Sequence, residues 1–294
     1  MGPLDLVKLT PLRDRTGGNP EIAIGLIDGP VAMDHPDLAG QRIHVVSEKA
    51  GAACSRFESV ACQHGTFVAG VLCARRGSDA PAICPDCTLL VRPIFSETAS
   101  ARGDMPSAKP EALAAAIIET VEAGARVLNL SAALVQPSSQ GENTLRQALD
   151  YAARKGVIVV AAAGNQGTLC SSGITRHPWV IPVAACDGQG KPLGMSNLGN
   201  SIGRLGLSAP GNGITSLGAD GQTRSFGGTS AATPFVTGAI ALLWSEFPGA
   251  SAAQVKMAVM QTGGRSRRTI APPLLDAWAA YQLMASSRSG SLVT

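Results

Sequence analysis

The sequence predicts an α/β fold of three layers, in which a mostly parallel β-sheet is covered by helices on both faces. Apolar runs of strand length alternate with longer segments whose apolar residues recur at helical spacing. This alternation is typical of a sheet that is buried on both faces. The strands are expected at 22–27, 88–94, 126–131, 157–162 and 179–185, and the helices at 65–75, 110–123, 141–155, 230–246, 251–261 and 273–284.

The strands are identified as apolar runs that stop at a polar or chain-breaking residue. The run 22–27 ends at Asp28, and Gly29-Pro30 interrupts the chain directly after it. The run 126–131 ends in the same manner at Ser131. Both runs therefore read as buried strands that deliver a polar side chain at their carboxyl ends.

The helices are identified from periodicity and from their first residues. In the segment 110–123, Pro110 occupies a position at which helices accept proline. Leu113, Ile117 and Val121 recur at helical spacing and would face the sheet. The same criteria identify the other helical segments.

Two stretches depart from the alternating pattern. Between 195 and 228 the segments become short and are separated by Gly, Asn and Ser-Ala-Pro turns, which predicts irregular strands and a hairpin. Residues 1–20 are expected to be an N-terminal extension, because the first strand begins near residue 21 and leaves no room for a folded pro-domain. With 294 residues, 45% of them hydrophobic, the chain is expected to form one domain, 1–294.

This topology brings five polar residues to one edge of the sheet. Asp28, Ser131 and Asn165 are expected at the carboxyl ends of strands. His64 and Ser230 are expected at helix starts, which lie on the same edge. Open parallel sheets bind their ligands there.

Ser230 is the candidate nucleophile. It follows Gly227-Gly228-Thr229 and opens a long apolar helix. Glycine permits a sharp turn, and a serine at the positive end of a helix has an exposed oxygen and a free backbone N–H. A serine hydroxyl is nonetheless a weak nucleophile until a base activates it and an acid orients the base.

His64 and Asp28 are the candidates for these two roles. His64 stands before Gly65-Thr66 at an expected helix start, whose positive end would favour the neutral imidazole. Each residue also has a purely structural explanation. Asp28 could be a turn aspartate, His64 a helix-start residue, Asn165 a left-handed turn residue and Ser230 an N-cap. The joint occurrence of all four favours the catalytic interpretation.

The segments around these residues, in the chain order Asp, His, Ser, resemble those of the subtilisin-like serine proteases, the subtilase family. Val157 to Asn165 resembles the strand that carries the family's oxyanion-hole asparagine. Val127-Leu128-Asn129-Leu130-Ser131 resembles the substrate-binding strand. The matches run in order from about residue 20 to 260, which is most of the chain.

The resemblance implies a serine endopeptidase that works through an acyl-enzyme and needs no cofactor. It implies catalytic roles for Asp28, His64 and Ser230, with the Ser230 N–H and the Asn165 side chain forming the oxyanion hole. A peptide or protein substrate would lie extended as an added strand. The substrate-binding residues that it implies are Leu130, Ser131, Ala132, Ala133, Ala163 and Gly164.

No metal site is expected. Secreted members of the family carry an Asn-rich calcium loop after the first helix, whereas residues 75–81 here read Arg-Arg-Gly-Ser-Asp-Ala-Pro, a poor set of oxygen ligands. Asp34 and Asp37 are the remaining candidates for holding a cation.

The chain has seven cysteines, so at least one is unpaired. Cys84-Pro-Asp-Cys87 has the spacing of a metal or redox motif but lacks a second pair of ligands. Cys54–Cys62 and Cys84–Cys87 are candidate disulfides, and free thiols are the expected state.

Within the family, three segments resemble the protease domains that mature cyanobactins and similar ribosomal peptides. They are Asp28-Gly29-Pro30-Val31, 92–96 and Gly141-Glu142. The resemblance implies a cytoplasmic enzyme that cleaves a precursor (leader) peptide. Macrocyclising members carry an extra helical insertion, and because the segment 96–110 is too short for one, hydrolysis is expected. The alternatives are a macrocyclase or transamidase with the same acyl-enzyme and an inactive, peptide-binding subtilase.

Other partners are not expected. The net charge is only +3, and the clusters Arg75-Arg76 and 265–268 are not interleaved with aromatic residues, which argues against nucleic-acid binding. No stretch has the length of a membrane-spanning helix, and residues 1–20 lack the apolar centre of a signal peptide.

Overall fold

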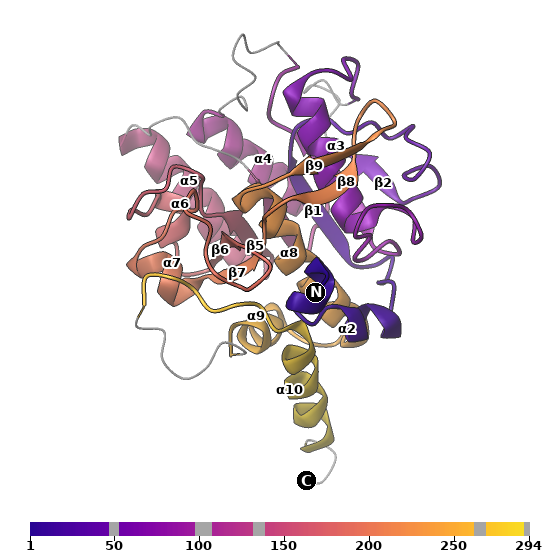
Figure 1. Ribbon diagram of the computed structural model, residues 1–294. Helices are drawn as coiled ribbons and strands as arrows, with labels where there is room; N and C mark the ends of the chain where they lie inside the picture. Colours follow the sequence, from indigo (N-terminus) through magenta and orange to yellow (C-terminus); the bar gives the residue numbers. More distant parts are fainter. Residues whose placement is uncertain (47–52, 98–107, 132–138, 262–268, 291–294) are drawn as a thin grey trace.

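The computed structural model describes residues 1–46, 53–97, 108–131, 139–261 and 269–290 (Figure 1). The strands are β1 Ala23–Asp28, β2 Ile43–Val45, β3 Thr88–Pro93, β4 Val127–Leu130, β5 Ile158–Ala162, β6 Val180–Cys186, β7 Leu207–Pro210, β8 Ile214–Leu217 and β9 Thr223–Phe226. The helices are α1 Pro3–Leu6, α2 Thr10–Arg15, α3 Val60–Cys73, α4 Pro110–Glu122, α5 Ser139–Arg154, α6 Gly173–Arg176, α7 Asn200–Leu205, α8 Thr229–Glu246, α9 Ala252–Gln261 and α10 Ala277–Gly290.

The predicted α/β fold is confirmed. Seven strands form one sheet in the order β2-β3-β1-β4-β5-β6-β7, and each pair of neighbours is parallel. The five predicted strands occupy its centre. The edge strand β2 was not predicted, because it is only three residues long and leaves little periodic signal. The other edge strand, β7, lies in the stretch 195–228, where irregular strands were predicted.

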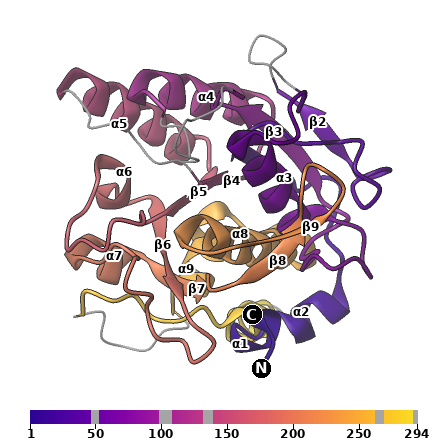
Figure 2. The same cartoon turned by 45° about the horizontal axis from the view of Figure 1, so that its top comes forward.

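Two apolar cores lie on opposite faces of this sheet. Ile24 and Leu26 of β1 point into one core and Ile27 into the other. The same alternation holds in β5, where Val160 joins the first core and Val159 the second. Side chains alternate in this way because successive Cβ atoms of a strand point to opposite faces. Figure 2 shows the consequence: α4 and α5 lie on one side of β4 and β5, and α8 lies on the other.

Several helices and the hairpin follow the sequence prediction, with shifted ends. The bounds of α4, α5, α8 and α9 agree within two residues, and β8 and β9 form the expected antiparallel hairpin. α3 begins at Val60 rather than 65, because Ser59 caps it by accepting a hydrogen bond from the Cys62 N–H at 3.1 Å. α10 begins at Ala277 rather than 273.

The N-terminal extension is part of the folded body. It contains α1 and α2, which the sequence interpretation had not assigned. The Ala277 N–H donates to the Val7 carbonyl at 3.0 Å, and Lys8 pairs with Asp276 at 2.6 Å. The Arg15 guanidinium lies 4.7 Å from the ring centre of Tyr281. These contacts join the first residues of the chain to α10 (Figure 1).

Within the part of the chain that the structure describes, no helix has both the length and the hydropathy that a bilayer crossing requires.

Candidate active site

Asp28 and His64 form a buried, hydrogen-bonded pair. His64 Nδ1 lies 2.7 Å from Asp28 Oδ1, which also accepts from the Gly29 N–H at 2.6 Å. Asp28 is completely buried and only 7% of His64 is exposed. A carboxylate on Nδ1 fixes the ring and leaves Nε2 as the nitrogen that can take up a proton. This is the geometry of a base held by an acid.

Two glycines allow this pair to form. A Cβ on Gly65 would lie 2.4 Å from the Gly29 carbonyl oxygen, and a Cβ on Gly29 would lie 2.0 Å from the Ala61 carbonyl oxygen. Neither approach is possible for a side chain that must stay clear of backbone atoms. The glycine after Asp28 and the glycine after His64 therefore let α3 pack directly against the end of β1.

The expected place of His64 in its helix is wrong. Because α3 begins at Val60, His64 is its fifth residue and lies beyond the first turn. The field of the helix end falls off within that turn, so the expected influence of the helix end on His64 is not supported. The ring instead packs near Phe226 of β9, with ring centres 6.2 Å apart. Phe226 also contacts Phe67 edge-to-face at 5.0 Å, so it links the imidazole to the core.

Ser230 lies at the start of α8, as the sequence predicts, and is its second residue because the helix begins at Thr229. Its N–H has no partner inside the helix, because the first N–H groups of a helix have no preceding carbonyl. Gly228, just before the helix, has φ +96°, a conformation that favours glycine. The Ser230 hydroxyl donates to the Ser131 carbonyl at 3.4 Å. To pass its proton to His64 it must turn away from this long hydrogen bond.

Asn165 lies over the start of α8. Its Oδ1 accepts from the Thr229 N–H at 2.9 Å and from the Thr229 hydroxyl at 3.0 Å. A Cβ on Gly228 would lie 2.8 Å from the same oxygen, so the glycine makes room for the amide. With Oδ1 held in this way, Nδ2 is the end of the amide that can donate to a reacting oxygen. The structure thus leaves one amide donor of Asn165 beside the start of α8, where Ser230 stands.

Thr229 was not assigned a role from the sequence. Besides binding Asn165, its Oγ1 accepts from the Gly164 N–H at 3.2 Å. Thr229, the residue directly before Ser230, is therefore hydrogen-bonded to the loop that carries Asn165. Its position next to the serine in Gly-Thr-Ser was the available signal.

The residues predicted to bind substrate gather at the same edge, as far as the structure describes them. Leu130 ends β4 and Ser131 follows it, both of them buried, and Ala163 and Gly164 follow β5. Ser131 Oγ accepts from Asn129 Nδ2 at 2.9 Å, so its side chain is engaged inside the fold. That agrees with a main-chain role in strand addition. Ala132 and Ala133 lie outside the described residues.

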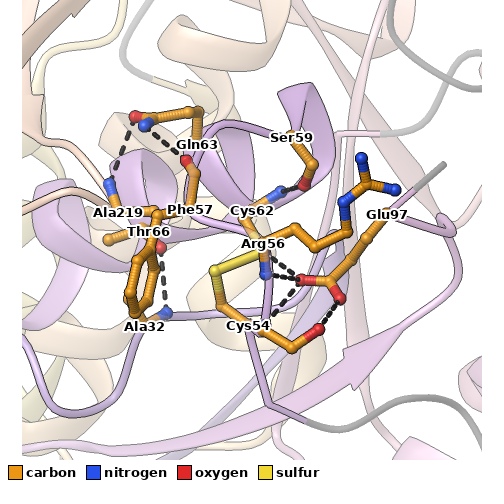
Figure 3. Close-up of a disulfide and its surroundings, with 11 residues drawn as sticks. Ala32, Cys54, Arg56, Phe57, Ser59, Cys62, Gln63, Thr66, Glu97 and Ala219 are labelled. Atoms are coloured by element: carbon orange, nitrogen blue, oxygen red, sulfur yellow. Dashed lines mark hydrogen bonds between the residues drawn. A yellow bond between two sulfur atoms is a disulfide. The ribbon is translucent and has the colours of Figure 1, made fainter. Parts of the chain in front are cut away.

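A disulfide joins Cys54 to Cys62, two residues before His64, with the Cα atoms 5.5 Å apart (Figure 3). The Glu97 carboxylate lies beside it and accepts from the Ser55 and Arg56 N–H groups at 2.7 and 3.1 Å. One of the two candidate disulfides is thus confirmed, and the expectation of free thiols is wrong for this pair. With both sulfurs bonded to each other, Cys54, Cys62 and Glu97 offer no thiolate to a metal.

The second candidate disulfide is not formed. Cys84 and Cys87 are free and buried. A hydrogen bond with Cys87 and burial together raise the pKa of the Cys84 thiol well above its ordinary value, and burial raises the pKa of Cys73 to about 12. The same hydrogen bond with Cys84 lowers the pKa of the Cys87 thiol. Cys84 and Cys73 are therefore the thiols that burial keeps neutral, and a neutral buried thiol is a poor metal ligand.

The residues that would have to hold a family-type calcium ion do not fit one. Arg75 Nη2 donates to Asp37 Oδ1 at 2.8 Å, and the Arg75 N–H donates to the Asp37 carbonyl at 2.8 Å. Arg76 Nη2 donates to the carbonyls of Arg13 and Thr16 at 2.7 and 2.9 Å. Arg75 therefore already pairs with Asp37, one of the two acidic candidates for a cation, and the other candidate, Asp34, is exposed.

Chelation is accordingly expected to have little effect. EDTA should leave Tm and kcat nearly unchanged, because the charge of Asp37 is already compensated by Arg75. Thermal melts and initial rates with EDTA and with added calcium test this, a dialysed sample serving as the control. A fall of many degrees with EDTA would reveal a strongly bound ion that stabilises the fold by mass action.

Comparison with known proteins agrees with this geometry. The model of the peptidase S8 family, the subtilase family, matches residues 19–276. Subtilisin DY from Bacillus licheniformis is 29% identical over 264 residues, which cover 88% of this chain and 89% of the relative. Subtilisin E from Bacillus subtilis (strain 168) is 30% identical over 250 residues, which cover 82% of this chain and 59% of the relative.

Two solved structures are similar over nearly the whole fold. A mutant of the protease domain of PatA has a TM-score of 0.83 at 31% identity, covering 92% of this chain and 97% of the other. The prenylagaramide maturation protease PagA has a TM-score of 0.81 at 28% identity, covering 93% and 97%. The chain belongs to the subtilase family and is a subtilisin-like serine endopeptidase.

Proposed function

We propose that Asp28, His64, Ser230 and Asn165 carry out the peptidase reaction, and that the enzyme removes the leader from a ribosomal precursor peptide inside the cell. The 2.7 Å contact between Asp28 and His64, at the edge that also holds Ser230, supports the catalytic part. The likeness to PagA and PatA, the second named a patellamide maturation protease, supports the substrate class.

The first half-reaction acylates the serine. Ser230 Oγ attacks the substrate carbonyl carbon while its proton passes to His64 Nε2. Asp28 stabilises the resulting imidazolium through its hydrogen bond to Nδ1. The carbonyl oxygen becomes an anion that accepts from Asn165 Nδ2 and from the Ser230 N–H. The carbon–nitrogen bond then breaks, and His64 returns the proton to the departing amine.

The second half-reaction frees the enzyme. Water attacks the ester carbonyl while His64 takes up one of its protons, and the same donors stabilise the second oxyanion. Collapse returns the proton to Ser230 Oγ and releases a carboxylic acid. An amine in place of water would yield a transamidated or cyclic product. The PatG macrocyclase shares the fold at 22% identity, which does not favour that outcome here.

The extent of substrate selection tests the processing role. The enzyme is incubated with casein and with a library of peptides obtained by tryptic digestion of a bacterial proteome, and the new chain ends are read by mass spectrometry. A processing protease is expected to cut a few peptides at a shared sequence and to leave casein largely intact. Indiscriminate cleavage of both would overturn the processing role while leaving the endopeptidase assignment in place. The Ser230→Ala variant controls for contaminating proteases.

The same digest in ¹⁸O-labelled water separates hydrolysis from aminolysis. Hydrolysis places one labelled oxygen in each new C-terminal carboxylate, because water attacks the acyl-enzyme. Unlabelled products that carry a new amide bond, or that are cyclic, would identify a transamidase instead.

A further inference from the structure

We infer that Asn197 is a positioning residue for the oxyanion-hole amide of Asn165, an inference that rests on the proposed role of Asn165. Asn197 lies between β6 and α7, directly after Met195-Ser196. Only 7% of it is exposed. A buried amide carries a desolvation cost unless its polar atoms are satisfied, so the identity of its partners indicates what it does.

The backbone on both sides of Asn165 is bonded to Asn197. The Asn197 N–H donates to the carbonyl of Gly164 at 2.9 Å. Asn197 Oδ1 accepts from the N–H of Gln166 at 3.1 Å. These two groups belong to the peptide units immediately before and after Asn165, so one residue holds both units that determine where the Asn165 side chain starts.

The Asn197 side-chain amide makes further hydrogen bonds along the same loop. Nδ2 donates to the Ala163 carbonyl at 3.2 Å and to Gln166 Oε1 at 2.6 Å. Oδ1 also accepts from the Thr168 N–H and from the Thr168 hydroxyl, each at 3.1 Å. The loop from Ala163 to Thr168 therefore wraps around a single side chain.

Gly164 makes this close packing possible. Its φ is +104°, and a Cβ there would lie 2.4 Å from Asn197 Nδ2. Glycine is the residue that accepts both the conformation and the contact. Thr229 then holds Asn165 Oδ1 from the α8 side. Asn197 thus holds the backbone of Asn165, and Thr229 holds its side-chain oxygen. Asn165 Nδ2 is left to donate.

The consequence is kinetic, because an oxyanion-hole donor acts only when it lies at the position that the developing charge will occupy. Asn197→Ala is expected to lower kcat by roughly tenfold to a hundredfold, the order of loss that follows a misplacement of about 1 Å. KM should change little. Asn197→Asp keeps the accepting oxygen but replaces the donating nitrogen. This variant should also have a lower kcat than the wild type.

A double-mutant cycle tests the inference. kcat, KM and Tm are measured, with active sites titrated, for wild type, Asn197→Ala, Asn165→Ala and the double variant. If Asn197 acts through Asn165, its substitution should cost less than about twofold once Asn165 is alanine. Ser208→Ala is the matched control: its buried hydroxyl donates to the Pro272 carbonyl at 3.0 Å, so its loss should lower Tm and leave kcat unchanged. Thr168→Val, which removes one bond to Asn197 on an exposed residue, gives a milder variant that should fold in any case.

The outcomes separate two kinds of failure. An equal loss of kcat from Asn197→Ala with and without Asn165 would overturn the positioning role while leaving Asn165 in the mechanism. A kcat that Asn165→Ala does not change would overturn the proposed oxyanion hole and the inference with it. A fall in Tm after Asn197→Ala with unchanged kcat would assign the residue to stability alone.

Discussion

Replacing Ser230 with alanine is expected to abolish peptide cleavage, with kcat falling by more than about a thousandfold, a magnitude taken from measurements on subtilisin rather than from this structure. The substitution removes the atom that attacks the substrate. The fold should be retained, because the Ser230 hydroxyl makes one long contact, 3.4 Å to the Ser131 carbonyl. kcat and Tm of the purified variant measure the two effects separately.

Three further variants sharpen this test. Ser225→Ala, on exposed β9, is the matched control and should be nearly silent. His64→Ala should be as inactive as Ser230→Ala, and the double variant no worse, because the two residues act as a unit. His64→Ala should also be less stable than the wild type, because it leaves the buried Asp28 carboxylate without its ring partner. Retention of more than about a thousandth of the wild-type turnover by Ser230→Ala would remove Ser230 as the nucleophile.

Asn165→Ala is expected to lower kcat by roughly a hundredfold to a thousandfold with little change in KM, a range that also comes from subtilisin. A substrate carbonyl in the ground state needs the Asn165 donor little. The tetrahedral oxyanion needs it greatly, because negative charge has then developed on the oxygen that accepts the hydrogen bond. The two hydrogen bonds from Thr229 to Asn165 Oδ1 leave Nδ2 as that donor.

Asn165→Asp separates this role from a structural one. Aspartate keeps an oxygen for Thr229 and loses the donor, so it should be as slow as alanine while Tm stays near that of the wild type. A turn role predicts the reverse, with a lower Tm and a kcat per folded molecule that hardly changes. An unchanged kcat in both variants would take Asn165 out of the mechanism.

The sequence by itself was sufficient for the central strands, for Ser230 at a helix start and for Asp28 at a strand end. These features are local. A short stretch of chain contains both the periodicity of a strand or helix and the residues at which that element ends. The position of His64 was only partly predictable. Apolar periodicity does not mark where α3 begins, since that depends on Ser59 as a cap.

Tertiary structure decided the contacts that join distant segments. Arg75 reaches Asp37, Cys54 reaches Cys62 beside Glu97, and Asn197 holds the loop of Asn165 across more than thirty positions of the chain. No periodicity records such pairs, because they depend on how the ends of separate strands and helices are packed together. The sequence therefore determined which residues can react, and the packing around Gly29, Gly65 and Asn197 decided how they are held.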